Sequence, residues 1–306
     1  MSADPGRLDW SREAADWPHR EVSRFIRAGG LQWHVQDFPC ASGDPAAPVV
    51  LLLHGTGAAT HSWRALAPLL ARGARVIAPD LPGHGFTDPA PSGGASPGGM
   101  AMRVQALLAA ISVQPARLIG HSAGGAIALR MALDGRLDPA ATSAGLVALN
   151  GALLPLHGLA WSWFSPAAKL LAAAPVVPHL VAWRAQGSAL VDRLLDGTGS
   201  QADETGRRLY ARLVGSPAHV AGALQMMANW DLEALRRDLP RLHPGFALHL
   251  VVGERDRTVP PHQAWQVQAL LPRTTVMSLP GLGHLAHEES AERVMQALQA
   301  SKPATG

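Results

Sequence analysis

Short apolar runs alternate with longer helical patterns along most of the chain. The short runs are rich in Val, Ile and Leu and are bounded by Gly, Pro, Asn or Asp, as buried strands commonly are. This alternation predicts an α/β fold with a mostly parallel central sheet and helices on both faces. The expected strands are residues 31–38, 49–54, 75–79, 117–120, 145–149, 248–253 and 274–279. The expected helices between them are residues 63–71, 100–111, 123–133, 261–271 and 291–300.

The alternation stops after the strand that ends near Asn150 and resumes only at the strand that begins at residue 248. Between these points the chain has the pattern of helices separated by Pro and Gly. A helical block inserted between two strands is most simply a cap over the strand ends, where open α/β sheets bind ligands. We therefore expect a first core part over 1–150, a cap over 151–239 and a second core part over 240–306. The expected cap helices are residues 167–173, 179–185, 189–195, 204–214 and 219–229.

Composition and the N-terminus narrow the class of protein. Apolar residues make up 47% of the 306 residues and charged residues 16%, which excludes a disordered chain. The formal net charge of +3 is small and scattered, so we expect no nucleic-acid partner. Cys40 is the one cysteine, which excludes an intramolecular disulfide and agrees with a reducing compartment. Trp10 and Trp17 precede the first expected strand, and we expect this aromatic segment to pack on the body.

The sequence contains neither the apolar segment of a signal peptide nor a stretch of about twenty residues free of charges and breakers. We therefore expect a cytoplasmic protein without a transmembrane helix. Attachment to a membrane surface stays open.

The strongest chemical signal is the stretch GHSAG, which follows an apolar strand and precedes an Ala-rich helix. A Gly-x-Ser-x-Gly sequence in this strand–turn–helix context predicts a nucleophile elbow with Ser122 at its tip. Positions 120 and 124 require a small residue such as glycine, because the turn brings the backbones of the strand and the helix close together. The alternative is a Gly-rich loop with a passive serine.

A serine hydroxyl needs a base, and the base needs a third group to orient it. Asp256 follows the strand 248–253, and His284 follows the strand 274–279. Both therefore lie at the carboxyl ends of strands, at the same sheet edge as Ser122 and in the order expected for this fold. Glu254 is an alternative acid. His287, three residues after His284, is expected to be a surface or capping residue. The alternative is that His284 and His287 together bind a metal.

Two backbone N–H groups are needed to stabilise the oxyanion that forms when an acyl group is attacked. One is the N–H group of Ala123, the residue that follows the nucleophile. The other is expected at Thr56, because the buried strand 49–54 ends in the loop HGTG. His54 is expected to shape this loop through backbone hydrogen bonds, and the loop DLPGHG over residues 80–85 is expected to buttress it.

The expected cap is rich in Trp, Phe and Met, which suit a roomy apolar pocket although such residues are often ordinary core. Together they favour a bulky apolar substrate, with Trp163, Met226 and Trp230 as candidate contacts. The full set is Trp161, Trp163, Phe164, Trp183, Met226, Met227 and Trp230.

The motifs HGTG, DLPGHG, GHSAGG, G-x-x-D-x-x-VP and GLGH together resemble the α/β-hydrolase superfamily over residues 31–300. Within that superfamily, several stretches look like the magnesium-chelatase accessory proteins of bacteriochlorophyll biosynthesis. This resemblance implies a role near magnesium insertion into protoporphyrin IX. The stretches are DWSREAADWPHREVSRF, HGTGAATHSWR, DLPGHGFT, GHSAGGAIALRMALDG, PGLGHLAHEE, FSPAAKLL and DGTGS.

Two functions are compatible with these residues. The first is a serine hydrolase that cleaves an ester or related acyl bond with Ser122, His284 and Asp256, without a metal or cofactor. The second is a non-catalytic accessory protein that binds a tetrapyrrole or the magnesium chelatase in or near its capped cavity.

Overall fold

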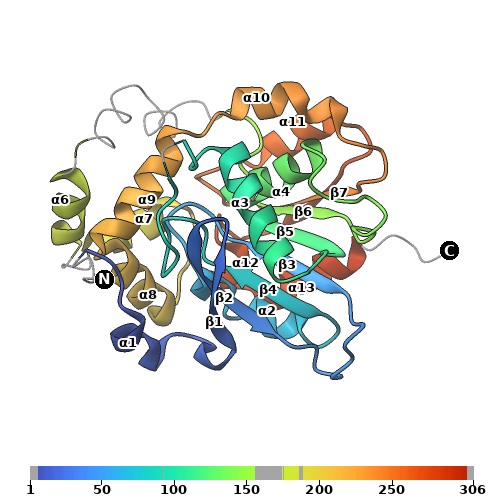
Figure 1. The fold of residues 1–306 in the computed structure, drawn as a ribbon. Coiled ribbons are helices and arrows are strands. Elements are labelled where there is room, and N and C mark those ends of the chain that lie inside the picture. Colours follow the sequence, from blue (N-terminus) through green and yellow to red (C-terminus); the bar gives the residue numbers. More distant parts are fainter. Residues whose placement is uncertain (1–5, 92, 156–173, 175, 186–188, 302–306) are drawn as a thin grey trace.

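A central sheet of eight strands runs through the molecule, in the order β1-β2-β4-β3-β5-β6-β7-β8 (Figure 1). This computed structural model describes residues 6–91, 93–155, 174, 176–185 and 189–301. Strands β3 to β8 are parallel, and β2 pairs antiparallel with both β1 and β4. The strands are β1 Ser23–Ala28, β2 Leu31–Phe38, β3 Val49–Leu53, β4 Arg75–Pro79, β5 Arg117–His121, β6 Leu146–Leu149, β7 Leu248–Gly253 and β8 Thr275–Leu279.

All seven expected strands are present, with ends that differ by at most one residue, so the predicted α/β fold is confirmed. The expectation that the first strand begins at residue 31 is wrong, because β1 precedes it. Most of the β1 side chains are at least partly exposed, so this edge strand lacks the apolar run of the buried strands. The Gly29-Gly30 pair, with φ of 57° and 79°, forms the tight turn into β2 and is the signal that marks this hairpin.

Helices cover both faces of the sheet because successive residues of each central strand point to opposite sides. In β3, Leu51 and Leu53 pack in one core with α3, α4, α10 and α11, whereas Val50 and Leu52 pack in the other with α2 and α13. In Figure 1, α3, α4, α10 and α11 lie on one side of the sheet, and α2 and α13 lie on the other. The body helices are α2 Leu66–Leu70, α3 Pro97–Ala110, α4 Ala123–Leu133, α10 Leu232–Asp238, α11 His262–Leu270, α12 Ala286–Glu289 and α13 Ala291–Ala300.

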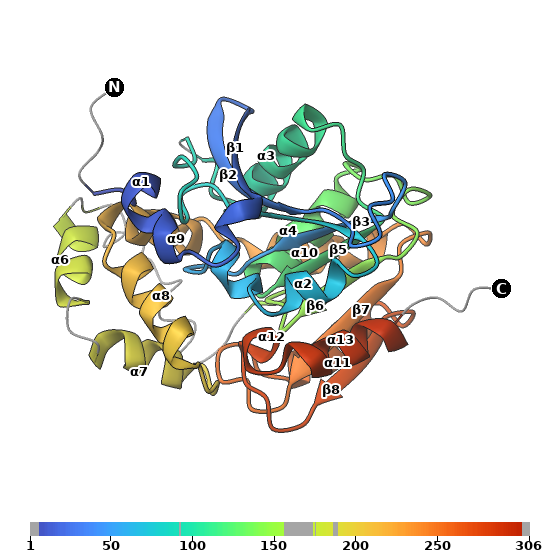
Figure 2. The ribbon, with the colours of Figure 1, turned by 90° about the horizontal axis from the view of Figure 1, so that it is seen from below.

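Four helices between β6 and β7 form a group at one side of the sheet, beyond the carboxyl ends of its strands (Figures 1 and 2). They are α6 Val176–Arg184, α7 Ala189–Gly197, α8 Glu204–Val214 and α9 Pro217–Ala228. Local signals mark the starts of two of these helices: Asp203 caps α8, and Ser216 followed by a proline caps α9. The expected helix over 167–173 lies outside the described residues.

Helix α10 packs on α4 rather than with this group. Leu232 and Leu235 lie in the main core, and Arg130 of α4 pairs with Asp238 at 2.8 Å. The division of the chain into core and cap at residues 151 and 239 stays a prediction, and the position of α10 favours an earlier end for the cap.

The N-terminal segment packs on the molecule, as the sequence predicted. Trp17 is buried and its indole N–H donates to Thr60 Oγ1 at 3.2 Å. Asp16 pairs with Arg212 of α8 at 2.8 Å, which ties the segment to the helical group as well. This segment contains the short helix α1, Trp10–Glu13. Within the described part of the chain, we find no helix with the length and apolarity that crossing a bilayer requires.

Candidate active site

Ser122 stands at the tip of a strained turn between β5 and α4. Its φ of 52° and ψ of −115° are unusual for a residue with a side chain, and such strain is typical of functional turns. A Cβ at Gly120 would lie 2.3 Å from the backbone of Gly124, and one at Gly124 would lie 2.0 Å from the carbonyl oxygen of Leu53. The two glycines are therefore required by close backbone contacts, as predicted, and Ser122 is left partly exposed at the sheet edge.

Asp256 is held at the carboxyl end of β7 by donors on every side. Its Oδ1 accepts the backbone N–H groups of Thr258 and Val259, both at 2.8 Å. Its Oδ2 accepts the Asn150 amide and the His284 ring, also at 2.8 Å. Four donors therefore fix the orientation of this buried carboxylate.

The His284 ring is buried and uses Nδ1 to donate to Asp256, which leaves Nε2 with its lone pair. His121, the residue before Ser122, contacts the backbone of His284: its Nε2 donates to the His284 carbonyl at 2.9 Å. The rings of His121 and His284 lie 4.7 Å apart, centroid to centroid. The structure therefore brings the loops of Ser122, Asp256 and His284 to one edge of the sheet.

The expected oxyanion loop lies against the nucleophile turn. A Cβ at Gly55 would be 3.0 Å from the Ser122 Cβ, so the Gly55–Thr56 peptide passes directly beside the serine. His54 accepts the Leu81 N–H at Nε2 and donates from Nδ1 to the Gly55 carbonyl, both at 2.8 Å. The prediction that His54 shapes this loop through the backbone is confirmed. Ala123 is the first residue of α4, where N–H groups lack acceptors within the helix.

His219 on α9 is a residue whose role the sequence analysis missed. Its Nδ1 accepts the Gly85 N–H at 3.0 Å, so the proton is on Nε2, which donates to the Gly57 carbonyl at 3.1 Å. The ring therefore bridges the loop HGTG and the loop DLPGHG. Burial lowers the pKa of His219 to about 4, so this neutral, bridging form persists near neutral pH. A histidine near the start of α9 carries no local signal for this long-range contact.

The loop between α7 and α8 holds the two loops that carry Asp256 and His284. The Thr198 carbonyl accepts the N–H of Arg257 at 3.1 Å and that of His284 at 3.4 Å. Ser200 Oγ accepts the Leu285 N–H at 2.8 Å. The helical group is therefore bonded directly to both loops, a connection that the sequence analysis also missed.

His287 is fully buried, so its reading as a surface residue is wrong. Its ring packs against that of His121, with centroids 4.5 Å apart, and its Nε2 donates to Ser62 Oγ at 2.8 Å, which in turn donates to Glu288 at 2.6 Å. Burial raises the pKa of Glu288, although Arg64 pairs with it at 2.6 Å. This network supports the loop that carries His284, because the His121 ring, against which His287 packs, also contacts the His284 ring. The described residues contain no group of three His, Cys, Asp or Glu side chains placed to bind a metal.

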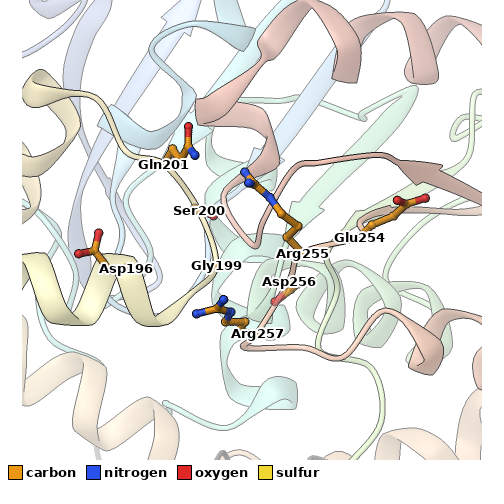
Figure 3. Close-up of a pocket in the computed structure, with 8 residues that line it drawn as sticks. All are labelled: Asp196, Gly199, Ser200, Gln201, Glu254, Arg255, Asp256 and Arg257. Carbon is orange, nitrogen blue, oxygen red and sulfur yellow. The ribbon is translucent and has the colours of Figure 1, made fainter.

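A surface pocket of about 440 Å³ lies between the Asp256 loop and the loop 196–201 (Figure 3). Arg255 and Arg257 extend toward the loop 196–201, whereas Glu254 points away. Glu254 is exposed, so the alternative acid does not contact His284, and Asp256 does. Asp256 lines this pocket but Ser122 and His284 do not, so it is not the space beside the candidate nucleophile.

The candidate substrate contacts differ in position. Met226 of α9 is fully buried, and its sulfur accepts the Thr56 hydroxyl at 3.3 Å, so it touches the oxyanion loop. Trp230 is partly buried against the main core. Trp163 lies outside the described residues. Trp183, one of the aromatics considered for a pocket, is 63% exposed on α6 and lines no interior space.

Comparisons with known proteins agree with the fold. The sequence profile of the alpha/beta hydrolase fold family matches residues 48–291. The magnesium-chelatase 30 kDa subunit of Rhodobacter capsulatus is 40% identical over 91% of this chain and 93% of that subunit. The sn-1-specific diacylglycerol lipase ABHD11 of Mus musculus is 26% identical over 84% of this chain and 81% of that protein. A solved α/β hydrolase fold protein from Burkholderia ambifaria superposes with a TM-score of 0.73 at 24% identity, over 91% of this chain and 97% of that one, which shows the shared fold.

Proposed function

Because this chain belongs to the α/β hydrolase fold family, we propose that it is a serine hydrolase whose nucleophile is Ser122. It is also a relative of a magnesium-chelatase subunit, so the resemblance in its motifs is confirmed. The finer proposal is that it cleaves an ester or related acyl bond of a bulky apolar substrate, in the biosynthesis of chlorophyll-type pigments.

In the proposed reaction, the Ser122 hydroxyl attacks the acyl carbon while His284 Nε2 removes its proton. Asp256 holds the Nδ1–H tautomer and stabilises the imidazolium that forms. The N–H groups of Thr56 and Ala123 bind the oxyanion. His284 then gives the proton to the leaving alcohol, and water attacks the acyl-serine by the same route. The acid then leaves and Ser122 regains its proton, so the reaction consumes one water.

The hydrogen bond between His284 Nδ1 and Asp256 Oδ2 is the observation that carries this proposal. At 2.8 Å, with both groups buried, it fixes the tautomer that a general base needs. A passive Gly-rich loop requires neither this pair nor the strain at Ser122. Met226 beside Thr56, together with the similarity to a diacylglycerol lipase, supports an apolar acyl group. A cytoplasmic location stays part of the proposal.

Hydrolysis of nitrophenyl esters of several chain lengths tests the proposal. Wild type should turn over at least one of them well above background, and Ser122→Ala should abolish the rate while its thermal midpoint stays unchanged. Equal background rates for both proteins at every chain length would contradict the proposal.

A second function rests on the 40% identity to a magnesium-chelatase subunit, whose name describes a part of a chelatase. In this alternative the chain binds a tetrapyrrole or the chelatase without turnover. Titration with protoporphyrin IX, followed by tryptophan quenching, should saturate at micromolar ligand if the tetrapyrrole version holds. Rescue of a strain that lacks the gene by Ser122→Ala separates the two functions, because only the alternative permits it.

A further inference from the structure

The outer face of α6 is a row of exposed apolar side chains. Val176, Leu180 and Trp183 are 68%, 52% and 63% exposed, and their spacing puts them on one side of the helix. The opposite side, with Pro178 and Ala182, is buried toward α9. The helix therefore has one face packed on the molecule and one apolar face in solvent.

This row is exceptional in the described part of the chain. No other large hydrophobic side chain there is more than 47% exposed, a value reached by Met102 and Trp265 at separate places. Scattered apolar residues are ordinary on a protein surface, but an aligned group that contains a tryptophan marks an interaction site. Helix α6 lies at the outer edge of the helical group, on the far side of α9 from the body (Figure 1).

Size and charge identify what covers the row. Three side chains expose a few hundred Å², far below the roughly 800 Å² per partner of a stable protein interface. The α6 sequence VVPHLVAWR contains no acidic residue, and exposed Arg184 follows Trp183 directly. Tryptophan, aliphatic side chains and arginine on one short helix suit the boundary between the headgroups and the acyl chains of a bilayer.

We propose that the outer face of α6 docks this protein reversibly on membranes that contain acidic lipids. Trp183, Leu180 and Val176 enter the headgroup region, and Arg184 contacts lipid phosphates. Docking through α6 turns the helical group toward the lipid, and α9, on which α6 packs, contacts the oxyanion loop through Met226 and His219. The surface thus brings a water-insoluble compound to the candidate active site, although the docking itself does not depend on the proposed hydrolysis.

Vesicle co-sedimentation of the full chain tests the proposal with two probes, pure phosphatidylcholine and phosphatidylcholine mixed with phosphatidylglycerol. Wild type should bind the mixed vesicles more tightly. Leu180→Asp should weaken binding to them about tenfold or more, because a charge replaces an apolar side chain that enters the bilayer. Arg184→Gln should weaken it about fivefold and reduce the preference for phosphatidylglycerol.

The matched control is Trp265→Ala, which removes another exposed tryptophan, on α11, and should leave vesicle binding unchanged. Because the altered side chains lie in solvent, the thermal midpoints of all variants should match the wild type. Failure of wild type to sediment with either vesicle would overturn the proposal, as would an equal loss with Trp265→Ala. A dimer in solution that Leu180→Asp dissociates would also overturn it, in favour of a second copy. Ester hydrolysis is measured separately, so either result leaves the proposed function to its own test.

Discussion

Replacing Asp256 with asparagine probes the proposed reaction more sharply than deleting the side chain. All four recorded partners of this carboxylate are donors: the N–H groups of Thr258 and Val259, the Asn150 amide and the His284 ring. In Asp256→Asn, the new amide has one acceptor oxygen in place of two. The oxygen keeps the two backbone donors, which cannot turn, so the new NH2 group faces Asn150 and His284.

Both of these neighbours can adapt. The Oδ1 atom of Asn150 is buried and has no partner among the described residues, so Asn150 can turn its amide and accept one hydrogen. His284 can accept the other only if its proton moves from Nδ1 to Nε2. The hydrogen bonds to residue 256 are then restored, but the turned Asn150 loses its bond to the Gly283 carbonyl, so we expect a stability loss of about 1–3 kcal/mol. A protonated Nε2 cannot take the proton of Ser122, however, so kcat should fall about 10⁴-fold, or roughly 5 kcal/mol in activation free energy.

The assay combines ester hydrolysis with ¹⁵N NMR of the histidine rings. Asp256→Asn should remain folded, lose activity and show His284 with its proton on Nε2. Glu254→Gln, two residues away on an exposed side chain, is the matched control and should keep wild-type activity. If Asp256→Asn retains more than about a tenth of the wild-type kcat, the assignment of Asp256 as the orienting acid is wrong.

Three further outcomes follow from named contacts. His219→Ala should lower kcat about tenfold or more because it leaves Gly57 and Gly85 without their bridge, whereas His219→Gln, which can both accept and donate, should recover part of the loss; equal kcat for all three proteins would remove this role. The pKa of His219 is lowered from 6.5 to about 4 in the fold, so its contribution to stability is complete above pH 6.5 and is lost as the pH falls toward 4; between pH 7 and pH 5, urea unfolding should show the wild type losing roughly 2 kcal/mol more stability than His219→Gln, because the other buried histidines with lowered pKa values contribute to both proteins. Gly124→Ala should reduce the thermal midpoint strongly because its Cβ meets the Leu53 carbonyl, while Gly98→Ala, with open space around it, should not; similar midpoints would contradict the packing argument.

The sequence predicted the parts of this molecule that local patterns determine. Apolar runs located the buried strands, and the Gly-x-Ser-x-Gly turn located the elbow, because sterics at Gly120 and Gly124 leave few alternatives. Strand β1 was missed because an edge strand needs no continuous apolar run. Asp256 and His284 could be placed at one edge because parallel strands carry their carboxyl ends to the same side.

The rest depends on contacts between distant segments, which no local pattern encodes. His287 lies within a charged stretch yet is buried behind His121, because α12 turns it toward the core. The bridge from His219 to Gly57 joins residues 162 positions apart. Trp183 was expected among residues that line a pocket, but helical spacing alone does not say which neighbour covers a face, and α6 presents it to solvent.

Covalent labelling with a fluorophosphonate tests the central claim most directly. An activated serine displaces fluoride and forms a stable phosphonyl ester, which intact mass and peptide mapping locate. Our account predicts one adduct per chain, on Ser122, formed slowly in Asp256→Asn and absent in Ser122→Ala. A folded wild-type protein that forms no adduct, or forms it on another residue, would contradict the account.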